Sequence, residues 1–129
     1  HYNLGNTFKK LGRLEEAEAS FREAIALKPD FAGAHYNLGN THKELGRFDE
    51  AVANYNQAIA FNPEHTEAHY NLGVTLQELE RLKEAEASYN KAIALKPDYA
   101  EAYSNLGNIL QRLGRLESNR RFHSPSLES

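Results

Sequence analysis

Apolar residues recur along the middle of the chain at intervals of three and four, the spacing of one face of an α-helix. Residues 34–61 contain two such stripes, the first formed by Ala34, Leu38, His42 and Leu45 and the second by Ala51, Val52, Tyr55, Ala58 and Ile59. Gly46-Arg47 separates them, and Asn62-Pro63 follows the second, where proline cannot continue a helix. The segment therefore predicts two helices joined by a tight turn.

This two-helix pattern repeats every 34 residues. HYNLGN opens the chain, returns at His35, recurs as HYNLGV at His69, and has a divergent copy, YSNLGN, at Tyr103. Residues 35–68 and 69–102 are identical at 20 of 34 positions. A fixed period of this length indicates stacked helical units instead of one globular core.

The repeat sets the expected boundaries. We predict helices near residues 1–11, 14–27, 32–45, 48–61, 66–79, 82–95 and 100–113. The array is expected to span residues 1–117, divided into 1–31 (partial), 32–65, 66–99 and 100–117 (partial). Residues 118–129 match no repeat and are expected to form a separate tail. Because the chain has no Met, we expect it to be part of a longer protein.

The repeated residues resemble the tetratricopeptide family, whose period is 34 residues. The matching positions are Leu4, Gly5, Phe8, Ala17, Phe21, Ala24 and Pro29, then Leu38, Gly39, Ala51, Tyr55, Ala58 and Pro63, then Leu72, Gly73, Ala85, Tyr89, Ala92 and Pro97. His or Tyr replaces the family's Trp, and His42, Leu76 and Leu110 replace its first Tyr. The resemblance implies an all-α solenoid, a right-handed superhelix of about three and a half repeats, with the first helix of each repeat on the concave face.

The composition of the chain argues against several classes of function. The chain has no Cys, which excludes disulfides and thiolate metal sites and favours a cytoplasmic location. It has no apolar run long enough for a membrane span, and its net charge of −3 does not indicate a nucleic-acid surface. Phosphate-binding loops and nucleophile motifs are absent, so we expect no enzyme activity and no cofactor.

The repeated histidines and glycines are expected to be structural. His1, His35 and His69 occupy a packing position in successive repeats, about 10 Å apart, whereas a shared zinc needs nitrogens at about 2.0–2.1 Å. We also expect no carboxylate to complete a metal site with His35 and His42. The glycines at the repeated position are expected to face a crowding neighbouring helix; they are Gly5, Gly39, Gly73 and Gly107.

Asn3, Asn37, Asn71 and Asn105 occupy a mid-helix position in four successive repeats. Asn is less favourable in a helix than Ala by about 0.5 kcal/mol, and packing of a helical core does not require it. Its amide can both donate to and accept from a peptide backbone. We therefore expect a binding role, and expect alanine there to leave stability unchanged or higher. The alternative is that the asparagines only bridge neighbouring helices.

The resemblance places a peptide-binding groove on the first helices, similar to the asparagine-lined groove of O-linked N-acetylglucosamine transferases. The expected groove residues are Tyr2, Asn3, Asn6, Tyr36, Asn37, Asn40, Lys43, Glu67, Tyr70, Asn71, Gln77, Glu101, Asn105 and Asn108. The tyrosines could equally serve to stabilise the next helix. The expected partner is thus a protein or peptide segment.

One known specificity of the family is not expected here. Relatives that hold acidic chaperone tails use Lys, Asn, Asn, Lys and Arg at set positions. This chain has Tyr2, Asn6, Asn37, Glu67 and Asn71 there, or Tyr36, Asn40, Asn71, Glu101 and Asn105 one repeat further on. The cations are missing, so we expect the groove to accept neutral or mildly basic segments.

Two other functions remain open. The array could be the substrate-recognition arm of a larger enzyme, such as a glycosyltransferase or sulfotransferase. It could also be a self-assembly scaffold. Because the fourth repeat lacks a recognisable second helix, we expect its apolar side to pair weakly with a second copy or to be covered by the tail.

Overall fold

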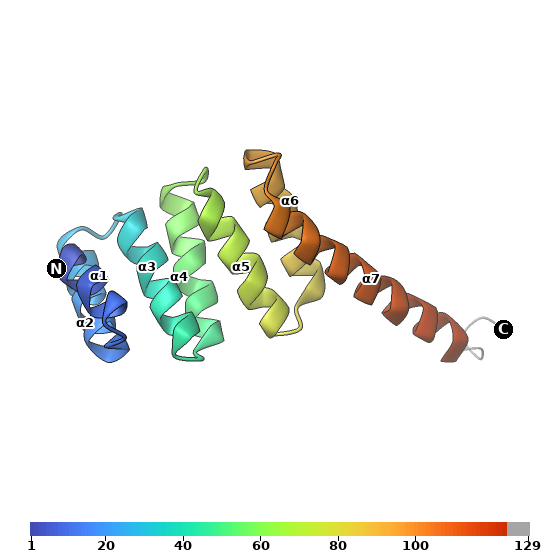
Figure 1. The fold of residues 1–129 in the computed structure, drawn as a ribbon, viewed down its shortest axis with the longest axis horizontal. Helices are drawn as coiled ribbons and strands as arrows, with labels where there is room; N and C mark the ends of the chain where they lie inside the picture. The colour runs from blue at the N-terminus through green and yellow to red at the C-terminus, as the bar shows by residue number, and fades with distance from the viewer. Residues whose placement is uncertain (124–129) are drawn as a thin grey trace.

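The structure, a computed structural model, describes residues 1–123, with side chains up to residue 120; every regular element in that range is an α-helix. The helices are α1 (Tyr2–Lys10), α2 (Leu14–Leu27), α3 (Ala32–Glu44), α4 (Phe48–Phe61), α5 (Thr66–Glu78), α6 (Leu82–Leu95) and α7 (Ala100–His123). The first six form three antiparallel pairs stacked side by side, and α7 packs on α6 (Figure 1). The predicted all-α solenoid is confirmed, and the first six helices lie within one residue of their predicted ends.

The turns within the three complete pairs use residues with positive φ. Gly12 and Gly46 take φ values of 76° and 77°, which glycine adopts without steric cost. Glu80 occupies the same place in the third pair with a φ of 60°. A side chain there costs about 1–2 kcal/mol, so the third turn is the most strained of the three.

The repeated glycines show why the helices of each pair can pack closely. A Cβ atom at Gly39 or Gly73 would lie 2.8 Å from the ring of Tyr55 or Tyr89, and one at Gly5 would lie 2.7 Å from Phe21. All three aromatic rings are fully buried. The predicted crowding is confirmed at these glycines. It is wrong at Gly107, where a Cβ atom would meet nothing within 4 Å.

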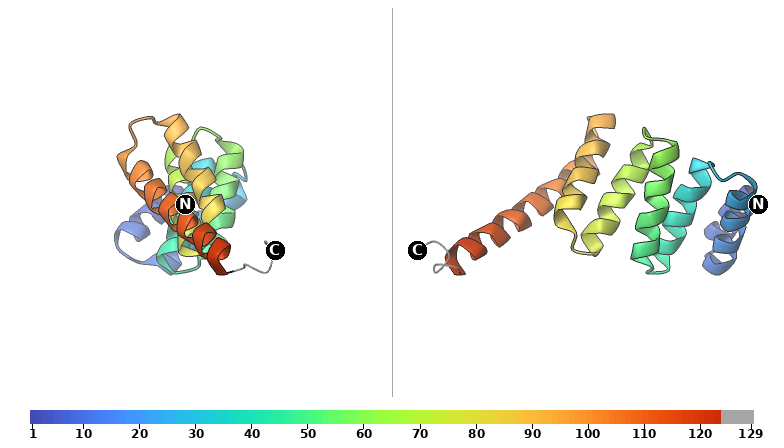
Figure 2. Two further views of the ribbon diagram at one scale, coloured as in Figure 1. Left: turned by 90° about the vertical axis from the view of Figure 1, so that its right-hand side faces the viewer. Right: turned by 180° about the vertical axis from the view of Figure 1, so that it is seen from behind.

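Gly107 differs because, within residues 1–123, no second helix of the fourth repeat packs against α7. The sequence predicts that it ends near residue 113, but it continues through Gly114 to His123 and projects beyond the stack (Figures 1 and 2). Asn119 and His123 stand where the second repeat has Ala51 and Tyr55, so no apolar face is available for a second helix. Residues 118–123 thus continue α7, and 124–129 lie outside the described residues. None of the described helices is long and apolar enough to span a bilayer.

The first helices line one side of the stack. Successive first helices pack on one another, α1 on α3, α3 on α5 and α5 on α7. Within residues 1–123, the second helices of successive repeats do not pack together in this way. Closer spacing on one side curves the stack, so α1, α3, α5 and α7 form its inner face.

The buried apolar residues form two clusters. The smaller contains Ala17, Phe21 and Leu38 from α2 and α3. The larger extends through α4–α7 and includes Val52, Tyr55, Leu76 and Tyr89. Between α2 and α4, α3 contributes the buried polar side chains of Thr41 and His42. The core is therefore interrupted near the junction of the first two repeats.

Candidate functional site

A row of asparagines crosses the inner face and connects the repeats. Asn37 Nδ2 donates to the hydroxyl of Tyr2, Asn71 Nδ2 to Tyr36 and Asn105 Nδ2 to Tyr70, with distances of 2.9, 2.8 and 3.1 Å. Each bond joins a residue of one repeat to a residue of the repeat before it. The expectation that alanine at Asn37 and Asn71 would not lower stability must therefore be revised, because the substitution removes these bonds.

The bridging bonds use only part of each amide. An asparagine amide has two N–H donors and an oxygen acceptor. The oxygen of Asn71 accepts from Lys43 Nζ at 3.3 Å, whereas those of Asn37 and Asn105 accept no bond from a side chain within residues 1–120. No buried side-chain polar atom in the described part is unsatisfied, so these two oxygens face solvent. They remain available to a ligand on the inner face.

The tyrosines paired with the asparagines also pack between repeats. The rings of Tyr2, Tyr36 and Tyr70 lie 4.6, 4.5 and 4.9 Å from the rings of Phe31, His65 and Tyr99, respectively. Burial, reinforced by Tyr70, raises the pKa of Tyr99 to about 12, which keeps its hydroxyl neutral. Helical spacing within one repeat does not reveal these contacts, but Phe31, His65 and Tyr99 are themselves 34 residues apart, which was the available signal.

Two further polar side chains of the expected groove, those of Asn40 and Gln77, form hydrogen bonds with buried tyrosines. The hydroxyl of Tyr55 donates to Asn40 Oδ1, and that of Tyr89 donates to Gln77 Oε1 at 2.9 Å. Burial raises the pKa of both tyrosines well above the usual value. Asn6 lies opposite Phe21, which has no hydroxyl to donate. Asn40 and Gln77 therefore have a structural partner that Asn6 lacks.

Two hollows lie along the inner face. The first, of about 540 Å³, is lined by Asn3, Asn6, Thr7, Lys9, Lys10 and Glu44. The second, of about 330 Å³, is lined by Val74, Gln77, Glu78, Glu80, Asn105 and Arg112. Asn3 and Asn108 are exposed, as are Glu67 and Glu101, which lie in the first turns of α5 and α7.

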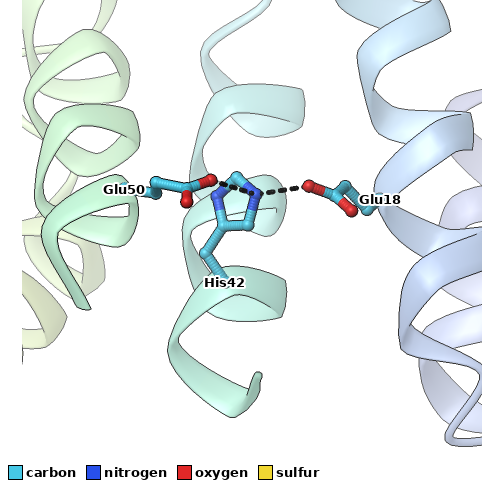
Figure 3. A group of neighbouring side chains, drawn as sticks. All are labelled: Glu18, His42 and Glu50. Carbon is cyan, nitrogen blue, oxygen red and sulfur yellow. Dashed lines mark hydrogen bonds and ion pairs between the residues drawn. The ribbon is translucent and has the colours of Figure 1, made fainter. Parts of the chain in front are cut away.

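A separate polar cluster joins the first two repeats (Figure 3). His42, whose side chain is 2% exposed, places Nε2 2.7 Å from an oxygen of Glu18 on α2 and 3.4 Å from one of Glu50 on α4. The expectation concerned a metal site shared by His35 and His42, and these two carboxylates approach His42 alone. The two carboxylates come from other helices, so spacing within one helix could not reveal them. The available signal was the pairing of polar His42 and Glu18 where the next repeat has Leu76 and Val52.

The hydrogen bonds of this cluster determine which ring nitrogen of His42 carries the hydrogen. Asn54 Nδ2 donates to the backbone carbonyl of Glu50 at 2.8 Å and lies 2.6 Å from His42 Nδ1. Because the Asn54 amide presents its donor side, Nδ1 accepts and Nε2 carries the hydrogen that faces Glu18. Arg22 and Arg47 also contact Glu18, at 3.1 and 3.2 Å.

The same three side chains have the composition of a metal site, since their ligand atoms lie within 4.8 Å of one another. A metal would require Nε2 of His42 to lose its hydrogen and Glu18 to release two guanidinium groups. In the structure, Nε2 of His42 keeps its hydrogen toward Glu18, and Glu18 keeps its contacts with Arg22 and Arg47. We therefore interpret the cluster as a polar junction between repeats.

Two of the three repeated histidines pack as expected, whereas His1 is exposed. His35 and His69 are buried and hydrogen bond through Nε2 to the carbonyls of Pro29 and Pro63, both at 2.9 Å. Burial lowers the pKa of His69. These bonds tie the start of each first helix to the end of the preceding repeat.

Solved structures with the same architecture include several repeat domains. The first TPR of Spaghetti (RPAP3), bound to the HSP90 peptide SRMEEVD, is 27% identical with a TM-score of 0.85 and covers 88% of this chain and 90% of its own. MamA is 26% identical with a TM-score of 0.86, and the match covers 98% of this chain and 74% of MamA. An O-GlcNAc transferase of Thermobaculum terrenum is 28% identical with a TM-score of 0.76, covering 84% of this chain and 21% of the transferase.

Sequence comparison identifies the family. No curated protein matches the chain in this comparison. The family model described as TPR repeat matches three overlapping stretches, residues 5–46, 39–80 and 75–114. These stretches include all seven helices in whole or in part. Together with the helical pairs and their 34-residue period, this match shows that the chain belongs to the TPR (tetratricopeptide) repeat family.

Proposed function

We propose that the inner face binds an extended peptide or protein segment through the segment's main chain. The observation that carries this proposal is the row of asparagine amides, repeated once per helical pair, whose oxygens at Asn37 and Asn105 face solvent. A binding surface needs polar groups held in fixed positions, and the bonds to Tyr2 and Tyr70 hold these amides in place.

The spacing of the row suits an extended chain. Packed helices lie about 8–10 Å apart, and an extended strand rises about 3.3 Å per residue. One amide per repeat would therefore meet every third residue of a ligand. Contacts to the main chain are independent of side-chain identity, so we expect tolerance of sequence along most of the groove.

The RPAP3 domain supports a peptide ligand, because it is solved with one and matches nearly the whole chain. Its acidic chaperone peptide is not the ligand that we propose here. Tyr2 and Glu67 stand where the clamp for such tails needs lysines, and Glu67 is exposed. The proposed ligand is instead an extended segment without a cluster of acidic residues.

The test compares two pairs of substitutions that break the same bonds. Asn37→Ala with Asn105→Ala removes the two amides whose oxygens face solvent, whereas Tyr2→Phe with Tyr70→Phe removes only the hydroxyls that they contact. The probe is a phage-displayed library of random peptides of about 12 residues, which span about 40 Å when extended. Peptides selected on the wild-type chain are then titrated against both variants by calorimetry.

We expect the asparagine variant to bind at least about tenfold more weakly, because each lost hydrogen bond contributes about 1 kcal/mol. The tyrosine variant keeps the amides and loses only the bonds that hold them in place, so its affinity should fall by a smaller factor, about threefold, although both variants lose similar thermal stability. Equal losses of affinity in the two variants would assign the asparagines a purely structural role. Failure of the wild-type chain to select any peptide would refute peptide binding itself.

A second candidate function is the recognition arm of a larger enzyme. Residues 1–123 form repeats and include no separate catalytic domain. The observation that favours this candidate is the likeness to the O-GlcNAc transferase, in which the matched part is 21% of that chain. The reading frame that encodes this sequence decides the matter: a catalytic domain fused to the repeats supports this function, and an open reading frame without one opposes it.

We also propose that two copies pair weakly through α7. Tyr103, Leu110 and Leu116 are 50%, 48% and 54% exposed along α7, and no second helix of the fourth repeat covers them within the described part of the chain. Apolar area removed from water contributes about 25 cal/mol per Å², and a second α7 would present the same apolar residues.

Light scattering across a concentration series tests the pairing. We expect the mass to rise toward that of a dimer for the intact chain. Leu110→Gln with Leu116→Gln should return it to the mass of a monomer, while Leu27→Gln, an exposed leucine on α2, should have no effect. A constant monomeric mass for the intact chain at high concentration would contradict the proposal.

A further inference from the structure

Lys9, which lines the first hollow of the inner face, has a counterpart in the next repeat. Lys9 on α1 and Lys43 on α3 occupy the same position in successive repeats, and both are half-buried. Burial lowers the pKa of each, and in each case a charge on Glu44 partly opposes the effect. The two ammonium groups are near enough that Lys43 further lowers the pKa of Lys9.

Neither ammonium group forms an ion pair. Five Arg–Glu ion pairs and four His–Glu contacts are present among residues 1–120, and none includes Lys9 or Lys43. The one hydrogen bond of Lys43 goes to the neutral oxygen of Asn71. Partly desolvated lysines ordinarily have a carboxylate partner, because removing a charge from water is costly.

The charges that line the first hollow favour an anionic ligand. Lys9, Lys10 and Glu44 line the hollow, so its charged lining carries a net positive charge even before Lys43 is counted. The remaining lining residues are Asn3, Asn6 and Thr7, which are neutral. The side-chain N–H groups of Asn6 and of the exposed Asn3 can donate to an anion.

The opposite end of the inner face differs. Gln77 and Gln111 replace the two lysines in the third and fourth repeats, and Arg112 at the second hollow is already paired with Glu80. Each hollow is lined by one glutamate of this repeated position, Glu44 or Glu78, but only the α1–α3 end offers an anion two ammonium groups that have no carboxylate partner among residues 1–120.

We infer that the α1–α3 end of the groove holds one acidic side chain of the bound segment, an Asp or Glu, between Lys9 and Lys43. This inference rests on the proposed peptide binding and adds a position and a direction to it. The acidic residue lies over the first two repeats, and the rest of the segment extends toward α7. The site differs in position from a clamp for chaperone tails, which needs cations where this chain has Tyr2 and Glu67.

The experiment uses the same random peptide library and a charge-matched control. Lys9→Gln with Lys43→Gln removes the lysine pair from the groove. Lys83→Gln with Lys91→Gln removes two exposed lysines from α6 and changes the net charge equally. Peptides are selected on the wild-type chain and on both variants.

We expect peptides selected by the wild type and by the α6 control to share one enriched Asp or Glu position, and those selected by the groove variant to lack it. Replacing that acid by Asn or Gln in a selected peptide should weaken binding to the wild type about tenfold, the usual effect of losing a charged hydrogen bond. The same change should leave binding to the groove variant unaltered.

Selected peptides without an acidic position, or an acidic preference that persists in the Lys9→Gln/Lys43→Gln variant, would overturn the inference while leaving peptide binding intact. If instead the wild type selects no peptides, both the proposed function and this inference fail. The outcomes of the two proposals can thus be told apart.

Discussion

The two junctions between complete repeats have the same backbone arrangement but opposite chemistry. Between the first and second repeats, Glu18 on α2 meets His42 on α3, and Arg47 and Asn54 complete a hydrogen-bonded cluster. One repeat later, the equivalent positions hold Val52 and Leu76, and both belong to the larger apolar core. The 34-residue period therefore preserves the helix positions but not the interactions between them.

The difference shows that a repeat interface can be stabilised in two ways. Burial of Val52 and Leu76 is favourable without requiring particular angles. The polar junction gains little net free energy, because its groups lose their hydration, but it leaves unsatisfied groups if any member is removed. The stability of the first junction is thus more sensitive to pH and to removal of one hydrogen-bonding side chain. The stability of the second is more sensitive to a reduction in the volume of a buried side chain.

The largest effect is expected at the apolar junction. Leu76→Ala should lower the free energy of unfolding by about 3 kcal/mol, because it removes a buried side chain and leaves a cavity. His42→Ala at the equivalent position should cost about 1–2 kcal/mol, because Glu18 keeps its contacts with Arg22 and Arg47.

Urea denaturation of both variants measures these costs. The matched comparison is valid because His42 and Leu76 are almost equally buried, at 1% and 3% exposure. A larger cost for His42→Ala would mean that the polar junction contributes more to stability than the apolar one.

Exchanging the chemistry of the first junction gives the next largest effect. Glu18→Val with His42→Leu reproduces the Val52–Leu76 pair, and replacement of buried polar pairs by apolar ones is often neutral or stabilising. We expect the double variant to match the wild type or exceed it by about 1–2 kcal/mol, while each single variant is less stable than the wild type. A double-mutant cycle measures the coupling. Additive single effects would show that Glu18 and His42 do not interact.

A smaller effect is expected at the strained turn that follows Leu76. Glu80→Gly should be more stable than Glu80→Ala by about 1 kcal/mol, because only glycine is free of strain at a φ of 60°. Both variants lose the exposed ion pair with Arg112, so that loss cancels between them. Thermal unfolding of the two variants measures the difference. Equal melting temperatures would show that the turn carries no strain.

The smallest effect is a pH dependence confined to the polar junction. Burial raises the pKa of Glu18, but the hydrogen bond from His42 and the contact with Arg22 outweigh burial, so its pKa lies below the ordinary value of 4.5. Its contribution to stability is therefore present above pH 4.5 and is lost as the pH falls through the lowered pKa. Below pH 4.5 the melting temperature should fall more steeply for the wild type than for Glu18→Val/His42→Leu. Parallel curves would contradict this assignment.

Periodic features of the sequence were sufficient for the fold. Stripes at helical spacing, proline after the second helix and the 34-residue period located six helices within one residue of their ends. The period also located the asparagine row. These features are local or repeated, so they can be recognised without knowing which residues touch.

The contacts within the candidate site could not be predicted in the same way. Asn37 and Tyr2 are 35 positions apart and belong to different repeats, so the bond between them exists only once the helices stack. The polar junction likewise gathers Glu18, His42 and Glu50 from three helices. Helical spacing describes one helix at a time and does not indicate which side chains meet across an interface.

The same limit applies to the backbone. The sequence LGRLE occurs at residues 11–15 and again at residues 113–117. Gly12 of the first copy takes a positive φ and ends α1, whereas Gly114 of the second lies within α7. After the first copy, Ala17 and Phe21 form an apolar face that packs on α1 and stabilises the turn. The second copy is followed by Asn119 and Arg120, which provide no such face. The sequence by itself therefore determined where a turn was possible, and tertiary packing decided whether the turn formed. The physical reason is that the chain reverses only when a second helix has apolar residues to bury against the first; without such residues, the first helix continues.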